Sequence, residues 1–357
     1  MTNNFWDGKR VLITGHTGFK GSWLSLWLSK LGANVIGYSL PPPTSPSHYV
    51  ISRVQEKLNI SIDADIRDLV SLADCITSQQ PEIIFHMAAQ SLVRYSYNNP
   101  VETFQTNVIG TVNVLEAVRK SSSVKAVVVV TSDKCYENRE FVWGYRENES
   151  MGGHDPYSSS KGCAELVAAS YRSSYFPVKE YAKHGVSLAT VRAGNVIGGG
   201  DWAVDRLVPD LLRANEQDKE VSIRNPNAIR PWQFVLEPLG GYIALAEQLY
   251  KDGASYAEAW NFGPRDDDML PVEVLINQLS ARLKNPIRYC LTPDPALHET
   301  IQLKLDCAKA AARLNWRPRT TISDTLQLIA DWQNSKLSGR DMQIVSLEQI
   351  DAFQSIK

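Results

Sequence analysis

The chain lacks an excess of charge of either sign, because its 37 Lys and Arg residues stand against 39 Asp and Glu residues, a formal net charge of -2. Proteins that bind nucleic acid or an anionic membrane surface through their overall charge carry a basic excess. The composition therefore argues against both partners. It leaves room for a local basic pocket that holds one diphosphate.

Cysteine is scarce and shows no pairing pattern. The five residues are an odd number and contain no Cys-x-x-Cys motif. Disulfide frameworks and zinc sites depend on regular Cys or His spacings. We therefore expect no disulfide framework and no metal site, and we expect Cys135 to pack as a small apolar side chain.

Long apolar runs are also missing. No segment approaches the roughly 18 consecutive apolar residues of a membrane span, and Met1–Asp7 lacks the features of a secretion signal. We expect a soluble, cytoplasmic protein. Its 357 residues, 43% of them hydrophobic, suffice for one large domain and a smaller one.

The first half of the chain alternates apolar strands with helices. Strands are predicted at 11–14, 34–38, 61–65, 83–88, 125–131, 187–192 and 259–262, and helices at 22–31, at 101–120 and from Pro156 onward. Asp155 suits the N-cap and Pro156 the first position of that last helix. The strands are apolar throughout, as in a parallel sheet covered on both faces. This pattern predicts a doubly wound, Rossmann-type parallel α/β sheet with ligands at the carboxyl edge of its strands.

The regular pattern weakens after residue 193. We therefore predict a dinucleotide-binding domain at 1–193 with return segments near 235–262. Residues 194–357 are predicted to form mainly a smaller, mixed α/β substrate-binding domain that is interleaved with the first. The proline-rich segment 41–46 reads as an extended surface loop.

A glycine motif follows the first strand. Gly15, Gly18 and Gly21 permit a tight turn, a close approach of the backbone to phosphate, and close packing of the next helix on the strand. The free N–H groups of that helix suit a pyrophosphate. The cofactor contacts predicted in this segment are Gly15, Thr17, Gly18, Phe19, Lys20 and Gly21.

The end of the second strand favours NAD over NADP. Residues 37–40 contain no basic side chain for a 2′-phosphate, and no acid for the ribose hydroxyls either. Ser39 is either a ribose contact or a plain strand-end hydroxyl. Further cofactor contacts are expected from small or polar residues at later strand ends, namely Ala88, Ala89, Gln90 and Thr131.

Two other polar residues in this region have alternative readings. Asn107, within the predicted helix 101–120, either contributes to the cofactor site or bonds backbone. His86, within the fourth strand, is expected to be a core histidine rather than a catalyst.

Tyr157 and Lys161 are four residues apart and so share one helix face. A phenol titrates near 10, so a tyrosine base at neutral pH needs about 4 kcal/mol of preferential stabilisation of its phenolate. The Lys161 ammonium and a positively charged nicotinamide can supply it. A chance pair on a surface helix is the alternative, and the glycine motif upstream argues against it.

Ser132, Asp133 and Lys134 follow the fifth strand directly. Ser132 is placed to hydrogen-bond a reacting hydroxyl, and a plain polar turn is the alternative. These residues together resemble the extended short-chain dehydrogenase/reductases that act on nucleotide sugars, over Val11 to about Trp332.

The segment after the fifth strand narrows the resemblance to the 4,6-dehydratase branch. That branch typically has Thr-Asp-Glu where this chain has Ser132-Asp133-Lys134. The lysine, with the runs 89–97 and 229–238, resembles members that act on CDP-glucose. The runs 192–202 and 305–318 are shared more broadly in the extended family.

The resemblance implies a catalytic cycle. Tyr157 removes the C4 hydroxyl proton while a hydride passes to NAD, C5 loses a proton, water leaves C6, and the hydride returns to C6. Asp133 and Lys134 would be the acid and the base, although a charged Lys134 that stabilises the C4 enolate is the alternative. The product would be CDP-4-dehydro-6-deoxy-D-glucose, an intermediate for deoxysugar and lipopolysaccharide O-antigen synthesis.

The resemblance also implies contacts with both ligands. Asp65 and Ile66 would contact adenine, unless Asp65 caps the next helix. Arg206, Arg230 and Asn195 are candidates for the diphosphate and the nucleobase side of the substrate. Arg94 is either a substrate contact or a surface arginine, and Trp232 either packs on the substrate or belongs to the core.

Relatives usually dimerise through two long helices, here 101–120 and 156–174, so we expect a homodimer or homotetramer. Other functions remain open. Another nucleotide-sugar 4,6-dehydratase would differ in the base recognised, and a 4-epimerase would share the tyrosine without the elimination. A non-catalytic NAD-binding regulator would need neither Tyr157 nor Lys161.

Overall fold

A seven-stranded sheet organises the molecule, and all of its strand pairs are parallel. The computed structural model describes residues 5–292 and 303–356. In spatial order the strands are β11 (Ala259–Asn261), β6 (Ser187–Arg192), β5 (Ala126–Val130), β4 (Ile83–His86), β1 (Arg10–Thr14), β2 (Asn34–Ser39) and β3 (Ile60–Asp63). The order reverses between β1 and β4, which is where doubly wound sheets bind ligands. The predicted fold class is confirmed.

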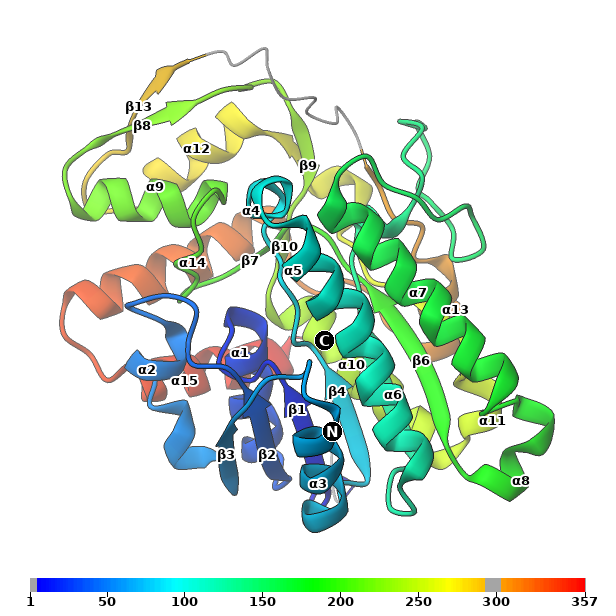
Figure 1. Cartoon of the computed structure of the whole chain (residues 1–357). Helices are drawn as coiled ribbons and strands as arrows, with labels where there is room; N and C mark the ends of the chain where they lie inside the picture. The colour runs from blue at the N-terminus through cyan, green and yellow to red at the C-terminus, as the bar shows by residue number, and fades with distance from the viewer. Residues whose placement is uncertain (1–4, 293–302, 357) are drawn as a thin grey trace.

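Alternate residues of the strands enter two separate cores. Val11, Ile13 and Val128 belong to the core on one face, while Leu12 and Val127 belong to the core on the other. The helices of the first face are α1 (Phe19–Lys30), α10 (Leu236–Lys251) and α15 (Met342–Ser355). Those of the second face are α3 (Leu69–Gln79), α6 (Gly110–Lys120) and α7 (Pro156–Ser174). Figure 1 shows α6 and α7 side by side over the sheet.

The predicted helix 101–120 is interrupted by a π turn. Helix α5 (Pro100–Phe104) continues into the π segment η2 (Gln105–Ile109) and then into α6. Asn107 lies in that turn, and its amide oxygen accepts the Gln90 N–H at 2.8 Å. Its amide nitrogen donates to the Gln90 carbonyl at 2.9 Å and to Ser160 Oγ at 2.8 Å. Asn107 therefore joins the loop after β4 to α7.

Two helix starts bear on the glycine motif and the Tyr157 helix. Helix α1 begins at Phe19, three residues before the predicted start, so its first turn belongs to the glycine motif. Helix α7 begins at Pro156 as predicted, and Asp155 accepts the Ser158 N–H at 2.9 Å as its N-cap.

A third core lies beyond the carboxyl edge of the sheet, at the upper left of Figure 1. It is built from α9 (Leu207–Glu216), β8 (Glu220–Ile223), α12 (Val272–Ser280), β13 (Arg288–Leu291) and α14 (Ile322–Leu337). The end of the chain returns to the sheet, because Met342, Val345 and Phe353 pack in the first core. The predicted return segment 235–262 contains α10, which packs in the first core, and β11, which joins the sheet; the second return at 342–355 was not predicted.

The remaining elements are short. The strands are β7 (Val196–Ile197), β9 (Ile229–Pro231), β10 (Gln233–Phe234) and β12 (Met269–Pro271). The α-helices are α2 (His48–Ile51), α4 (Val93–Asn98), α8 (Tyr181–His184), α11 (Gly253–Tyr256) and α13 (Ala308–Leu314). The 3₁₀ turns are η1 (Val54–Lys57), η3 (Asp133–Cys135), η4 (Val178–Glu180) and η5 (Asp266–Asp268). The segment 41–46 forms neither helix nor strand, as expected.

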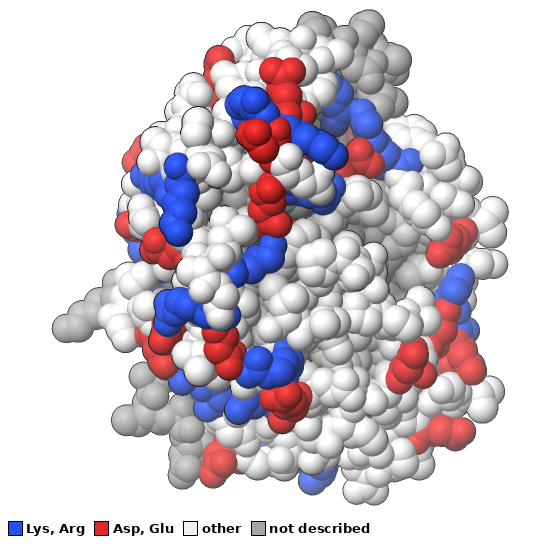
Figure 2. Space-filling view, turned by 90° about the vertical axis from the view of Figure 1, so that its left-hand side faces the viewer, with Lys and Arg blue, Asp and Glu red and all other residues white. Residues whose placement is uncertain are grey.

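The surface carries both signs of charge. On the face shown in Figure 2, basic and acidic side chains are interspersed.

No helix within residues 5–292 and 303–356 has the length and apolar character needed to cross a membrane. All five cysteines are free thiols, and Cys135 is fully buried.

The first core predicts a large difference between two leucines. Leu28 on α1 is fully buried, whereas the Leu337 side chain at the end of α14 is 51% exposed. Leu28→Ala leaves a cavity and is expected to lower the free energy of unfolding by about 2–5 kcal/mol. Leu337→Ala is expected to change it by less than about 0.5 kcal/mol. Urea denaturation measures both, and equal losses would contradict the assignment of α1 to the core.

Candidate active site

A cavity of about 1390 Å³ lies along the carboxyl edge of the sheet. Pockets for a single small ligand usually measure about 300–1,000 Å³, so this one has room for two ligands. Every predicted site residue lines it except Asn107. The ends of β1 to β6 form one wall, and the unit that contains α9 and β8 forms the other. The structure thus brings the predicted cofactor and substrate residues into one space.

The glycine motif forms a cradle within this cavity. Gly15 has a φ of +76°, and a Cβ there would lie 2.7 Å from the Ala88 nitrogen. A Cβ at Gly21 would overlap the Gly15 carbonyl. Gly18 precedes α1 without a capping side chain, and the first turn of α1 carries no acidic residue. The free N–H groups of α1 are therefore available to a pyrophosphate, and the cradle fits a dinucleotide.

The far end of the cradle is closed by hydroxyl groups. Thr17 Oγ1 lies 2.9 Å from Ser39 Oγ and donates to the Leu40 carbonyl at 2.9 Å. Ser39 therefore has a protein partner and also lines the cavity. No basic side chain stands at residues 37–40, in keeping with the expectation of NAD.

After β3, the structure excludes one of the two interpretations of Asp65. Asp68, not Asp65, caps α3, so the reading of Asp65 as a helix cap is wrong. Asp65 accepts the Arg67 N–H and the Arg67 Nε–H, each at 2.8 Å. The hydrogen bonds from Arg67 outweigh burial and lower the pKa of Asp65. Ile66 is buried beside Gly110 and, like Asp65, lines the cavity.

His86 is a core residue, as expected. Its two ring nitrogens lie 2.8 Å from Thr14 Oγ1 and 3.1 Å from Thr111 Oγ1. Burial lowers the pKa of His86 to about 3, and the nearby Lys161 acts in the same direction.

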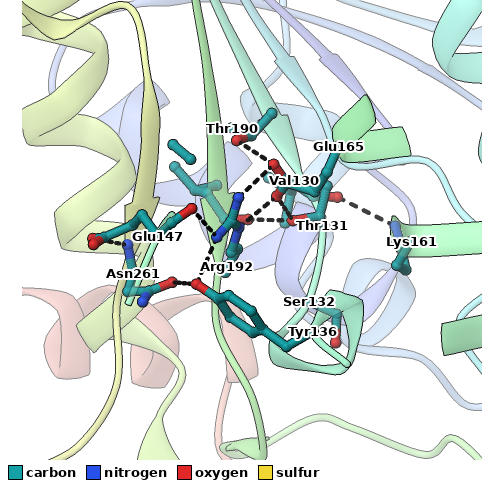
Figure 3. A network of polar contacts seen from close by, with 12 residues as sticks. Val130, Thr131, Ser132, Tyr136, Glu147, Lys161, Glu165, Thr190, Arg192 and Asn261 are labelled. Carbon is teal, nitrogen blue, oxygen red and sulfur yellow. Dashed lines mark hydrogen bonds and ion pairs between the residues drawn. The ribbon is translucent and has the colours of Figure 1, made fainter. Parts of the chain in front are cut away.

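Tyr157 and Lys161 project from the same face of α7 toward η3. Lys161 Nζ donates to the Val130 carbonyl at 3.2 Å, and the Tyr157 N–H donates to Ser96 Oγ at 3.1 Å (Figure 3 shows Lys161 beside Val130). Burial raises the pKa of Tyr157 to about 12, although a hydrogen bond with Ser132 acts in the opposite direction. Burial, with added repulsion from Lys20, lowers the pKa of Lys161 to about 7. A phenolate near neutral pH therefore requires additional positive charge from a bound ligand.

Asp133 has an unused carboxylate oxygen in the cavity wall. Only 2% of the residue is exposed, and Oδ1 accepts the Ser132 hydroxyl at 2.9 Å. Oδ2 is buried with no hydrogen-bond partner among the described residues. A Cβ at Gly194 would overlap Oδ2, so only glycine leaves space for it. Oδ2 is thus enclosed against Gly194, while Asp133 as a residue contributes to the cavity wall.

Lys134 completes the segment after β5. The backbone N–H of Lys134 donates to Ser132 Oγ at 3.2 Å, and Lys134 lines the cavity. The short turn η3 thus presents Ser132, Asp133 and Lys134 to the same space as Tyr157.

Basic side chains gather where the two walls meet. Arg206 pairs with Asp201 at 3.0 Å and donates to Ser91 Oγ at 3.0 Å. Burial, and then repulsion from Arg206, lower the pKa of Lys20 to about 8, while Asp133 opposes the shift. Both residues line the cavity, as does Arg230. This arrangement suits an anionic ligand such as a diphosphate.

The other predicted substrate residues differ in their surroundings. Arg94 pairs with Asp205 at 3.5 Å. Asn195 has a φ of +44°, and its carbonyl accepts the Gln233 N–H at 3.2 Å. Trp232 is only 6% exposed, packs in the third core and donates to the Leu270 carbonyl at 3.3 Å. Trp232 therefore belongs to the third core, as one of its two interpretations expected, and it also lines the cavity.

Several cavity residues were not predicted. Arg67, Ser91 and Asp201 line the cavity and hold predicted site residues through the contacts described above. Behind the cavity, a buried Glu165–Arg192 pair contacts the segment before Ser132. Glu165 lies eight residues after Tyr157, so helical spacing alone places both on one face.

Comparison with known proteins gives matches along almost the whole chain. Residues 12–329 match the family described as GDP-mannose 4,6 dehydratase. The chain is 55% identical to the CDP-glucose 4,6-dehydratase of Salmonella typhimurium, over 99% of each sequence. It is 24% identical to the CDP-paratose 2-epimerase of Salmonella typhi, over 91% of this chain and 99% of that one.

Solved structures show the same fold. MoeE5 in complex with UDP-glucose and NAD has a TM-score of 0.76 at 22% identity, covering 92% of this chain and 99% of its own. The UDP-glucose-4-epimerase of Stenotrophomonas maltophila, solved with bound NAD, has a TM-score of 0.78 at 20% identity, covering 93% and 99%.

The cradle predicts a difference between two glycines with similar positive φ values. Gly15 and Gly339 have φ values of +76° and +74°, but a Cβ at Gly339 meets nothing within 4 Å. Each alanine substitution costs about 1–2 kcal/mol of backbone strain. Only Gly15→Ala also obstructs the cradle, so we expect it to raise the Kd for NAD at least about tenfold. Calorimetric titration measures this, and equal affinity in both variants would refute the cradle.

Proposed function

The chain belongs to the GDP-mannose 4,6 dehydratase family, and within it we propose that this protein is an NAD-dependent CDP-glucose 4,6-dehydratase. It converts CDP-D-glucose to CDP-4-dehydro-6-deoxy-D-glucose and water. The full-length similarity to the Salmonella typhimurium enzyme supports the choice of substrate. The observation that carries the reaction type is that Asp133 and Lys134 share one cavity with Tyr157 and Lys161.

The cofactor site is assigned to the glycine cradle. The residues that would hold NAD are the 15–21 turn, Ser39, Asp65, Ile66, the 88–90 segment and Thr131, all of which line the cavity. When bound there, NAD would supply hydride transfer between C4 and C6 and a positively charged ring beside Tyr157, whose ionisation burial opposes.

The chain's own residues handle the protons. Tyr157 takes the C4 hydroxyl proton, Lys161 stabilises the resulting phenolate, and Ser132 hydrogen-bonds the same hydroxyl. The C4 ketone acidifies C5, which loses its proton, and Asp133 gives a proton to the C6 hydroxyl so that it leaves as water. C5 regains a proton when hydride reaches C6, so the sugar loses only one water overall.

Lys134 can act in this reaction either as a base or as a stabilising cation. As a base it must be neutral before it takes the C5 proton, and as a cation it would stabilise the negative charge on the C4 oxygen. Its place next to Asp133 on η3 supports both. We assign it the role of base, because the carboxyl group of Asp133, in the same wall of the cavity, is assigned the role of acid.

The substrate diphosphate is assigned to the basic side of the cavity. Arg206, Arg230 and Asn195 are its candidate partners, and Arg94 is a further candidate substrate contact. The exposed apolar residues Val101, Ile109 and Leu166 on α5, η2 and α7 support pairing of two copies through these helices as a homodimer or homotetramer. We place the enzyme in the cytoplasm, in deoxysugar synthesis for lipopolysaccharide.

Product mass tests the proposal directly. Purified protein with NAD and CDP-glucose is expected to give a product that has lost one water, whereas a 4-epimerase product keeps the mass of its substrate. Tyr157→Phe removes the base and is expected to lower kcat by about 10²–10⁴-fold. Tyr175→Phe, at a residue 49% exposed and outside the cavity, is the matched control. An unchanged mass, or full turnover by Tyr157→Phe, contradicts the proposal.

Two variants at position 134 separate its two roles. If Lys134 is the base, Lys134→Ala and Lys134→Arg both stop exchange of the C5 hydrogen with deuterated water, since arginine stays protonated. Nuclear magnetic resonance of CDP-glucose measures that exchange. If Lys134 only supplies positive charge, Lys134→Arg keeps the exchange, and the assignment as base is wrong.

A further inference from the structure

A buried ion pair stands directly behind the Tyr157–Lys161 pair. Arg192 Nε lies 2.8 Å from Glu165 Oε1, and Arg192 Nη2 lies 2.9 Å from Glu165 Oε2. The two side chains are 3% and 5% exposed, respectively. Figure 3 shows the guanidinium and the carboxylate face to face between β6 and α7. Such a bidentate contact fixes geometry as well as charge.

Glu165 also holds the strand ends that lead into the site. Its Oε1 accepts the Thr131 hydroxyl at 2.5 Å, and its Oε2 accepts the Thr190 hydroxyl at 2.7 Å. Thr131 immediately precedes Ser132, Asp133 and Lys134. Glu165 itself lies on α7, one turn after Lys161 and two turns after Tyr157. One carboxylate therefore connects the helix that carries Tyr157 to the segment that carries Asp133.

Arg192 extends the same network along the cavity wall. Its Nη1 donates to Tyr136 Oη at 2.5 Å and to the Glu147 carbonyl at 3.0 Å. Tyr136 donates to Asn261 Oδ1 at 2.8 Å and lines the cavity. Gly194 comes two residues after Arg192 in the sequence, and it leaves the space that Asp133 Oδ2 occupies.

We propose that Glu165 and Arg192 are positioning residues of the dehydratase reaction. Their ion pair fixes the segment 131–134 against α7, and its balanced charge sets the pH range in which Tyr157 and Lys161 work. This inference rests on the proposed function, because it assigns roles relative to that reaction.

The charges around Lys161 decide the sign of the effect. Lys161 faces Lys20 from α1, His86 from β4, Cys135 from η3 and Glu165 from its own helix. Burial and Lys20 lower the pKa of Lys161, whereas the charge of Glu165 raises it. Removing the Glu165 charge is therefore expected to lower the pKa of Lys161 further.

The other groups are placed as follows. Tyr157 faces Asp133 from η3, Arg206 from the second wall, Asp155 at its own N-cap and Tyr242 from α10. The ion pair also faces Arg172 from α7 and Cys135. Burial opposes ionisation of Glu165, but the Arg192 charge and the hydrogen bonds outweigh it, so the pKa of Glu165 lies below its ordinary value. The carboxylate is thus charged at neutral pH.

The two single neutralisations have opposite consequences. Glu165→Gln leaves the Arg192 charge unopposed, which favours the Tyr157 phenolate and disfavours the Lys161 ammonium. Both limbs of the pH profile of kcat/KM then move to lower pH. Arg192→Gln leaves the Glu165 charge unopposed, and both limbs move to higher pH. A role limited to folding would lower activity without moving either limb.

The experiment compares the pH profiles of kcat/KM for CDP-glucose in wild type, Glu165→Gln, Arg192→Gln and the double variant. We expect shifts of about one pH unit in opposite directions for the single variants. In the double variant the limbs return to the wild-type positions, while kcat stays about 10-fold to 100-fold lower from lost positioning, with KM little changed. Melting temperature and Kd for NAD are measured alongside.

Glu237→Gln is the matched control. Glu237 on α10 is 1% exposed and accepts the Arg319 N–H at 2.8 Å and the Thr320 hydroxyl at 2.8 Å, away from the cavity. Its neutralisation is expected to lower the melting temperature and to leave both limbs in place. Unmoved limbs in Glu165→Gln and Arg192→Gln would overturn the inference.

Two further outcomes keep the test decisive. If the single variants do not fold, wild-type kcat in the folded double variant would overturn the inference. A kcat about 10-fold to 100-fold lower, with KM, melting temperature and Kd for NAD all unchanged, would support it. If wild type forms no dehydrated product, the proposed function fails instead. Normal product formation with unmoved limbs means that only the inference fails.

Discussion

Burial opposes the charged forms that Tyr157 and Lys161 need, and the rest of the site compensates for this. In the protein alone, burial raises the pKa of the Tyr157 phenol to about 12 and lowers that of the Lys161 amine to about 7. Burial therefore disfavours the charged forms of this pair until ligands enter. A cation beside the phenol makes proton removal feasible, and the anionic substrate favours the protonated lysines. Binding and proton transfer are coupled through the same buried charges.

The parallel sheet makes this coupling possible. Six strands end at the edge where the cavity lies, and each contributes a short segment to its wall. Helix α7 then brings Tyr157, Lys161 and Glu165 past the end of β5 along one face. The segment that carries Asp133 lies against helix α7. This contact arises because β5 and β6 are neighbours and Arg192, at the end of β6, pairs with Glu165 on α7. The chemistry thus depends on strand order as much as on residue type.

Local patterns in the sequence were sufficient for much of the fold and the site. The apolar strands, the Asp155 cap and the glycine turn are set by nearby residues, and they are found where they were expected. Tyr157 and Lys161 were identifiable because a helix repeat places them together. These features depend on interactions within one or two turns of chain.

Features that depend on distant contacts were not predictable. Asn107 lies in a π turn, and its side chain hydrogen-bonds Gln90 and Ser160. Trp232 packs in the third core. Helical spacing places Glu165 on the face of Tyr157. Its contact with Arg192 depends on the neighbouring strand and could not be predicted from that spacing. The return of Met342–Ser355 to the first core likewise depends on packing across the whole chain.

In the proposed reaction, one cavity removes hydrogen from C4 and delivers it to C6 of the same sugar. Turnover of CDP-glucose carrying deuterium at C4 and a heavy-carbon label in its glucose ring, mixed with unlabelled CDP-glucose, tests it by mass spectrometry and nuclear magnetic resonance. Deuterium is expected at C6 of the molecules that carry the heavy carbon. Deuterium that stays at C4, or is lost to water, would contradict it.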